Sequence, residues 1–372
     1  MDFLKFGFET DIGSSRCNQD RCFVWRNDNN RLYVFGVADG HGRLGELVAD
    51  TVKNMMMEFL DQGELDVDTN VPDFLEKCFD CFQEKLQSLL EEFGVFDGKT
   101  GGTTLSVAVI SNNILFVANV ADSSIILCTR EKKLQQTMVK HVRDCAEPLT
   151  EQLLVKSVEE PSVQTLELTS NHSADCVNEY KRMLRTHPSK SNPNVPELRF
   201  LYDAHHIPKR LCKPIFNLSE TFEPILDPSG VYYKNVCRDW GTIVVPTTDD
   251  VHLAFTRSLG DFFFNSLGVS AKPEIQSIDL NELAERLEDQ LVCIVAATDG
   301  LWDNWLPEHV GKFVLDPSCI EAVKTKPDIG ALRVAQSLMN RNTMYGKRNF
   351  GVNNLDNTTV VLAYIDLRCI LK

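Results

Sequence analysis

The stretch Arg31-Leu32-Tyr33-Val34-Phe35-Gly36-Val37-Ala38-Asp39-Gly40-His41-Gly42 joins an apolar run to a polar turn. Aromatic and β-branched residues dominate positions 31–38, which favours a β-strand. We therefore expect Asp39-Gly40-His41-Gly42 to lie at the end of that strand. The pattern recurs near the other end of the chain, where an apolar run over residues 291–297 leads into Thr298-Asp299-Gly300.

Helical and strand-like segments alternate along the rest of the chain. Apolar residues recur every three or four positions over residues 44–60 and 73–93, which predicts two helices that each bury one face. Residues 103–110 and 114–120 predict an antiparallel hairpin that turns at Ser111-Asn112-Asn113. We also expect strands over 124–129, 251–256, 291–297 and 358–365 and a helix over 329–344. This mixture indicates an α+β fold.

Residues 187–250 differ from their surroundings because many prolines interrupt any long helix or strand. We interpret this segment as an inserted lobe or lid. A length of 372 residues suits either one large domain or two smaller ones. With the family resemblance described below, we predict a single domain over residues 1–372 that carries this insertion.

The formal charge of −15 argues against a nucleic-acid partner, since phosphate backbones attract clusters of Lys and Arg. No window approaches the roughly 18 consecutive apolar residues of a membrane span. The first ten residues have neither a basic, apolar secretory pattern nor a glycine for myristoylation. We expect an intracellular monomer, in the cytoplasm or the nucleus or both, with reduced cysteines.

Four aspartates stand at the edges of predicted strands, and they are Asp39, Asp122, Asp299 and Asp356. Carboxylates at strand ends can converge on a shared cation, and hard ions such as Mg²⁺ and Mn²⁺ prefer oxygen ligands. The alternative for any single site is an ordinary turn, because Asp-Gly and Asp-Asn are common turn dipeptides. Four such sites in one chain favour the metal hypothesis.

In its motifs the chain resembles the type 2C (PPM) family of metal-dependent protein phosphatases. The matching segments follow the family's order over nearly the whole chain. They are Asn18-Gln19-Asp20, Val37-Ala38-Asp39-Gly40-His41-Gly42, Gly102-Thr103-Thr104, Ala118-Asn119-Val120-Ala121-Asp122-Ser123, Leu168-Thr169-Ser170-Asn171-His172, Ser258-Leu259-Gly260-Asp261, Ala297-Thr298-Asp299-Gly300-Leu301-Trp302-Asp303 and Asp356-Asn357-Thr358-Thr359. The resemblance implies two antiparallel sheets packed as a sandwich and flanked by helices, with an enlarged flap insertion.

The resemblance also implies a metal site that holds two Mg²⁺ or Mn²⁺ ions and a weaker third one. Asp39 would bridge the two main ions, the Gly40 carbonyl would bind one, and Asp299 and Asp356 would bind the other. Asp20 would act from the outer shell. Asp122 would hold the third ion together with Asp299.

The implied reaction is hydrolysis of phosphoserine and phosphothreonine in protein substrates. A hydroxide that bridges two ions about 3.5–4 Å apart would attack phosphorus directly. His41 is then the expected general acid for the departing oxygen, and Arg16 is the expected phosphate ligand.

Four positions depart from the family pattern. Arg16 lies four residues before Asp20, where the family's phosphate-binding arginine lies five before. Gln19 replaces a frequent Glu, Ser124 the usual Arg, and Asn171 the usual Asp. None of these changes removes a ligand of the two main ions.

Two other functions fit the same sequence features. A catalytically silent pseudophosphatase would keep the fold as a binding scaffold, although Asp39, Asp299 and Asp356 are all retained. Hydrolysis of a small phosphorylated metabolite would use the same residues. We set aside a phosphate loop at 94–100 and a redox or zinc role for Cys78 and Cys81, because their spacing and surroundings do not fit.

Overall fold

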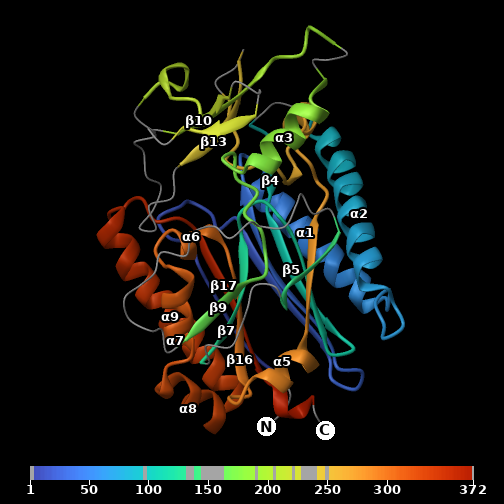
Figure 1. The fold of residues 1–372 in the computed structure, drawn as a ribbon, viewed down its shortest axis with the longest axis vertical. Helices are drawn as coiled ribbons and strands as arrows, with labels where there is room; N and C mark the ends of the chain where they lie inside the picture. Colours follow the sequence, from blue (N-terminus) through green and yellow to red (C-terminus); the bar gives the residue numbers. More distant parts are fainter. Residues whose placement is uncertain are drawn as a thin grey trace.

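The computed structural model describes residues 4–94, 99–130, 138–143, 163–188, 192–203, 207–219, 223–227, 241–247 and 251–370 of the chain. Two antiparallel sheets lie face to face at its centre, and helices cover both outer faces (Figure 1). Parts of the predicted insertion lie outside the described residues. Residues 95–98, which belong to the excluded phosphate-loop alternative at 94–100, also lie outside them.

The first sheet has the strand order β14-β4-β3-β5-β6-β15-β8, and β2 also pairs with β3. Its strands are β2 (Asp20–Asn27), β3 (Leu32–His41), β4 (Gly102–Thr103), β5 (Leu105–Ser111), β6 (Ile114–Val120), β8 (Lys140–Arg143), β14 (Leu259–Gly260) and β15 (Glu274–Asp279). The predicted hairpin is confirmed as β5 and β6, and both Asn112 and Asn113 adopt the positive φ that its tight turn requires.

The second sheet has the order β1-β17-β16-β7-β9. Its strands are β1 (Leu4–Asp11), β7 (Ser124–Thr129), β9 (Gln164–Glu167), β16 (Leu291–Ala297) and β17 (Thr358–Asp366). β16 and β17 are buried along their whole length, because one face packs on the other sheet and the other face packs on helices.

The core alternates along each central strand, as the two-residue period of a strand requires. On β3, Tyr33, Phe35 and Val37 pack into the cluster between the sheets, whereas Val34 and Ala38 pack into the outer cluster. The chain thus forms four layers in the order helix, sheet, sheet, helix.

The outer layers contain the predicted helices. α1 (Gly45–Asp61) and α2 (Val71–Glu92) cover the first sheet, whereas α7 (Pro307–Val314), α8 (Pro317–Thr325) and α9 (Pro327–Asn349) cover the second. Short helices α4 (Phe262–Asn265), α5 (Leu280–Arg286) and α6 (Asp299–Trp302) follow strands β14, β15 and β16. No helix of the described chain is long and apolar enough to cross a membrane.

The described parts of the predicted insertion form two small sheets beyond one end of the sandwich (Figure 1). β10 (Leu198–Tyr202) pairs with β13 (Thr242–Pro246), and β11 (Phe216–Leu218) pairs with β12 (Pro224–Leu226). A 3-10 turn, η3, covers Lys209–Leu211, and α3 (Val177–Thr186) precedes the insertion. The strand predicted over 251–256 is wrong, since this stretch makes only isolated bridges, such as that of Phe255 with Ser173.

A buried ion pair connects α3 to the segment that follows the insertion. The Arg257 guanidinium donates to Glu179 Oε1 over 2.7 Å, and these side chains are 1% and 3% exposed. Glu179 Oε2 accepts further hydrogen bonds from Arg182 and from the Thr256 hydroxyl. Although burial opposes ionisation, these donors outweigh it and hold the pKa of Glu179 well below its usual range.

We expect Glu179→Gln to destabilise the fold by about 3–5 kcal/mol, because it leaves the Arg257 charge buried without its partner. Lys181→Met is the matched control on the same helix, since it breaks the exposed Lys181–Glu223 pair. That change should cost less than about 1 kcal/mol. Urea unfolding of both variants measures the two costs, and equal costs would contradict the importance of the buried pair.

Candidate functional site

Four of the predicted aspartates come together at one end of the sandwich because of strand register. Asp20 and Asp39 are directly paired residues of β2 and β3. Asp299 opens α6 immediately after β16, and Asp356 precedes β17, which pairs with β16. Residues that are distant in sequence therefore lie together where these strands begin or end, at one end of the sandwich.

Asp39 interacts electrostatically with all the other aspartates predicted as metal ligands. Its pKa is raised well above the usual value, first by loss of hydration and then by the charges of Asp20, Asp299, Asp356 and Asp122. Like charges at close range destabilise one another's ionised form. The five carboxylates thus form one electrostatic cluster.

Asp20 shows the cost of this arrangement most clearly. Its side chain is buried, and its pKa is raised to about 7 by burial, against the opposing hydrogen bond from Thr298, with further raising by Asp299 and Asp356. Thr298 Oγ1 donates to Asp20 Oδ2 over 2.8 Å. The other oxygen, Oδ1, is buried and accepts no hydrogen bond from the described residues.

These groups fit a hard divalent cation. The donors are carboxylate oxygens, their repulsion needs a counter-charge, and the buried Asp20 Oδ1 has an unused acceptor position. In the described parts of the chain, no three His, Cys, Asp or Glu side chains are arranged closely enough to hold an ion as they stand. The site is therefore an acidic cluster and not a closed ligand set.

Gly40 has almost no room around its Cα position. A Cβ there would lie 2.2 Å from the Gly45 carbonyl oxygen and 2.9 Å from that of Gln19. The Gly40 N–H donates to the Gln19 carbonyl over 3.2 Å. Only glycine fits here, and the tight packing joins the strand end, the β1–β2 loop and the start of α1.

His41 lies at the end of β3, two residues beyond Asp39, and is partly exposed. Its Nε2 lies 2.7 Å from Oδ2 of Asp261, and its ring meets the edge of the Phe255 ring. Burial lowers the pKa of His41, but the charge and hydrogen bond of Asp261, with the charge of Asp122, outweigh it and raise this pKa. The sequence motif that contains Asp261 does not by itself indicate this contact.

Arg16 lies exposed in the loop between β1 and β2, and its side chain makes no hydrogen bond or ion pair with the described residues. The Asn357 side chain ties this loop to the Asp356 segment. Its oxygen accepts from the Gln19 N–H over 2.8 Å, and its amide donates to the Ile12 and Cys17 carbonyls. The Arg16 guanidinium is thus carried on a loop that hydrogen bonds to the Asp356 segment of the acidic cluster.

Ser124 and Asn171 also depart from the family pattern. Ser124 begins β7 directly after Asp122 and Ser123, and Asn171 is exposed. His172 is buried instead, and its Nε2 lies 3.4 Å from Glu274. Burial and the charge of Arg257 lower the pKa of His172, so the neutral form is favoured.

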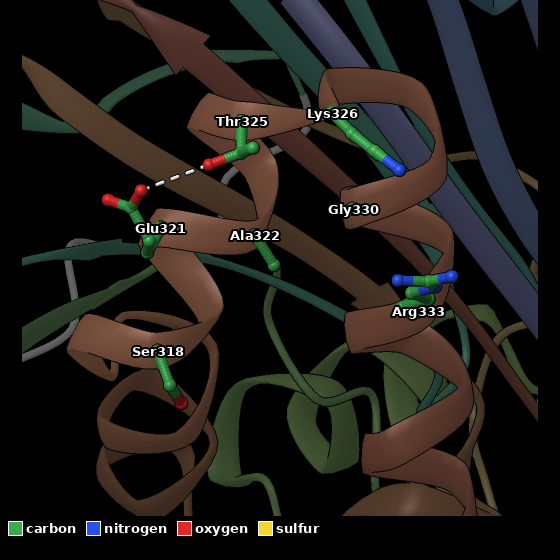
Figure 2. A pocket seen from close by; sticks show the side chains of 7 residues that line it. All are labelled: Ser318, Glu321, Ala322, Thr325, Lys326, Gly330 and Arg333. Atoms are coloured by element: carbon green, nitrogen blue, oxygen red, sulfur yellow. Dashed lines mark hydrogen bonds between the residues drawn. The ribbon is translucent and has the colours of Figure 1, made fainter.

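A surface groove of about 360 Å³ lies between α8 and α9, and Figure 2 shows the side chains along it. It is lined by Ser318, Glu321, Ala322, Thr325, Lys326, Gly330 and Arg333. None of the predicted site residues belongs to this lining, and α8 lies near the opposite end of the sheets from α6 (Figure 1). The groove is separate from the acidic cluster.

Comparison with known families identifies the family to which the chain belongs. Two profiles described as protein phosphatase 2C match the chain, one over residues 9–185 and the other over 160–349. The chain belongs to the protein phosphatase 2C family. The family assignment from sequence motifs is thereby confirmed, as is the α+β sandwich.

Plant members of the family are similar over most of the chain. Probable protein phosphatase 2C 72 of Arabidopsis thaliana is 24% identical over 299 residues, which cover 78% of this chain and 67% of the relative. Probable protein phosphatase 2C 35 of the same plant is 22% identical, covering 76% and 62%. The chain thus spans about two thirds of the length of these relatives.

Solved structures share the fold at low identity. A serine-threonine phosphatase 2C from Toxoplasma gondii superimposes with a TM-score of 0.57 and 15% identity, covering 98% of this chain and 95% of the other. A C. elegans sex determining protein gives a TM-score of 0.52 and 14% identity, covering 98% and 65%. These similarities establish the phosphatase 2C fold.

The raised pKa of Asp20 predicts how stability depends on pH without metal. A pKa near 7 in the folded state, against 3.8, means that the folded protein keeps a proton that the unfolded chain loses, so the free energy of unfolding falls as pH rises from 4 to 7. Asp20→Asn abolishes this fall. Relative to wild type, the free energy of unfolding of the variant should therefore rise by about 2–4 kcal/mol between these pH values.

Urea unfolding in chelator at several pH values measures this difference. Asp61→Asn is the control, because Asp61 is an exposed aspartate that accepts a hydrogen bond from Trp25. A stability difference between Asp20→Asn and wild type that stays constant from pH 4 to 7 would contradict the electrostatic interpretation.

Proposed function

We propose that this chain is a metal-dependent protein phosphatase that hydrolyses phosphoserine and phosphothreonine in protein substrates. The observation that carries the proposal is the convergence of four aspartate charges on Asp39, two residues from a histidine that is held by a carboxylate. Such a cluster is unfavourable without cations and becomes useful with them. Membership of the phosphatase 2C family supports the same reaction.

The two main Mg²⁺ or Mn²⁺ ions would be held by Asp39, the Gly40 carbonyl, Asp299 and Asp356. Asp20, whose carboxylate accepts a hydrogen bond from Thr298, would act on the ions from the outer shell. Asp122, with Asp299, suits a weaker third ion. When bound, such ions supply a water of lowered pKa as the nucleophile and offset the charge of the phosphate.

The remaining residues act on the substrate itself. The exposed Arg16 guanidinium can form paired hydrogen bonds with phosphate oxygens, which fixes the phosphorus in front of the cluster. His41 gives a proton to the Ser or Thr oxygen as the P–O bond breaks, since an alkoxide is a poor leaving group. The departing side chain leaves as a neutral alcohol.

We expect the purified chain to release phosphate from a phosphothreonine peptide with Mn²⁺ or Mg²⁺ and to stop in chelator. Asp299→Ala should fall to the chelated level of the wild type, because it removes one of the carboxylates that would hold the ions. Asp61→Asn should keep wild-type turnover. Sugar phosphates, tested in parallel, should react far more slowly than the peptide.

Other outcomes separate the alternatives. No turnover with either metal, from protein shown to be folded by circular dichroism, would favour a binding scaffold that keeps the fold without catalysis. Faster turnover of sugar phosphates than of the peptide would make the chain a metabolite phosphatase.

A further inference from the structure

His41 and Asp261 are brought together by three strands that are far apart in sequence. β3 pairs with β4 so that His41 faces Gly102, and β4 pairs with β14 so that Gly102 faces Gly260. Asp261 is the next residue after Gly260. The ladder therefore delivers its carboxylate to the strand end that carries His41.

The contact itself is short and sheltered. Nε2 of His41 lies 2.7 Å from Oδ2 of Asp261, whose side chain is only 4% exposed. An ionised carboxylate can only accept a hydrogen bond, so the Nε2–H of His41 donates. With the Phe255 ring 5.0 Å away on an edge, the imidazole is held by both a bond and a packing contact.

The backbone around Asp261 is shaped for this contact. Asp261 adopts a left-handed conformation with φ of +46°, and its N–H donates to the Gly101 carbonyl over 3.2 Å. A Cβ on Gly102 would lie 2.4 Å from Oδ2 of Asp261. The carboxylate thus occupies space that exists only because residue 102 is glycine.

A glutamine from α2 holds the segment before Asp261 in place. Oε1 of Gln83 accepts a hydrogen bond from the Gly260 N–H over 2.8 Å, and Nε2 donates to the Gly260 carbonyl over 3.1 Å. Its Nε2 also donates to the Asn265 side chain. Both peptide groups around Gly260 are therefore fixed, and the position of Asp261 is fixed with them.

We propose that Asp261 is a positioning residue for His41, and that Gln83 holds Asp261 in place. Asp261 engages Nε2 of the imidazole and so orients the ring, which leaves Nδ1 as the nitrogen that passes a proton to the departing oxygen of the substrate. This inference rests on the proposed phosphatase function, because it concerns how the acid of that reaction is aimed.

The test compares substrates that do and do not need a proton on the leaving oxygen. Asp261→Asn is the suitable variant, since Asn tolerates left-handed backbone conformations and preserves the shape of the side chain. We expect its kcat on a phosphothreonine peptide to fall about tenfold or more, while kcat on p-nitrophenyl phosphate changes less than about threefold. Nitrophenolate leaves readily without a proton.

A double-mutant cycle separates positioning from general damage. His41→Ala should show the same selective loss, and His41→Ala/Asp261→Asn should be no worse than His41→Ala alone, because Asp261 acts through the ring. Gln83→Leu should lose peptide turnover selectively but less severely. Gln87→Leu, one turn further along α2, removes an exposed side chain that donates to Glu91 and should match wild type.

Three results would overturn the proposal. They are equal losses of Asp261→Asn on both substrates, unchanged peptide turnover, or losses that multiply in the double variant. A readout independent of turnover is nitrogen NMR of the histidine rings. The wild type should show a hydrogen-bonded Nε2 proton that is missing in His41→Ala and altered in Asp261→Asn.

That spectrum also distinguishes the two levels of inference. If the wild type hydrolyses no substrate but shows the bonded Nε2 proton, the phosphatase proposal fails and the positioning contact stands. If the wild type is active and lacks that proton, the contact fails and the phosphatase proposal stands.

Discussion

Repulsion between carboxylates at one end of the sandwich is the constraint on which the site depends. The charges of Asp20, Asp122, Asp299 and Asp356 all raise the pKa of Asp39, in addition to the effect of burial. Without a counter-charge, each ionised member destabilises the others. The fold holds them together by forces that are unrelated to their charge, namely strand pairing and the packing of apolar layers.

The covalent and hydrogen-bonded frame around the cluster explains how it withstands this repulsion. Asp20 and Asp39 cannot separate without breaking the β2–β3 ladder. Thr298 bonds the Asp20 carboxylate with its hydroxyl and the Thr359 carbonyl with its N–H, which joins β2 to β16 and β17. The cluster is therefore pre-organised, and a cation would meet ligands whose ordering is already provided by the fold.

A second layer of polar contacts links the cluster to the segments around the insertion. Asp261, which is hydrogen bonded to His41, lies four residues after Arg257. The Arg257 guanidinium is buried against Glu179 of α3. Buried ion pairs contribute little net stability, but they penalise any arrangement that separates their partners. This pair therefore keeps α3 and the Arg257–Asp261 segment in one fixed relation, close to the histidine.

The sequence by itself determined the local elements and the acidic residues. Predicted strands at 114–120, 124–129 and 291–297 agree with β6, β7 and β16, because short-range periodicity reflects which faces are buried. It also named the aspartates, since their motifs are local, although their ligand roles remain predictions. Only the tertiary structure decided which distant residues meet. The strand expected over 251–256 is wrong, since residues there make isolated bridges with Val244 and Ser173 and Thr256 bonds to Glu179 of α3. The contact of Asp261 with His41 spans 220 positions. Such partners depend on strand order and register, which no local pattern records.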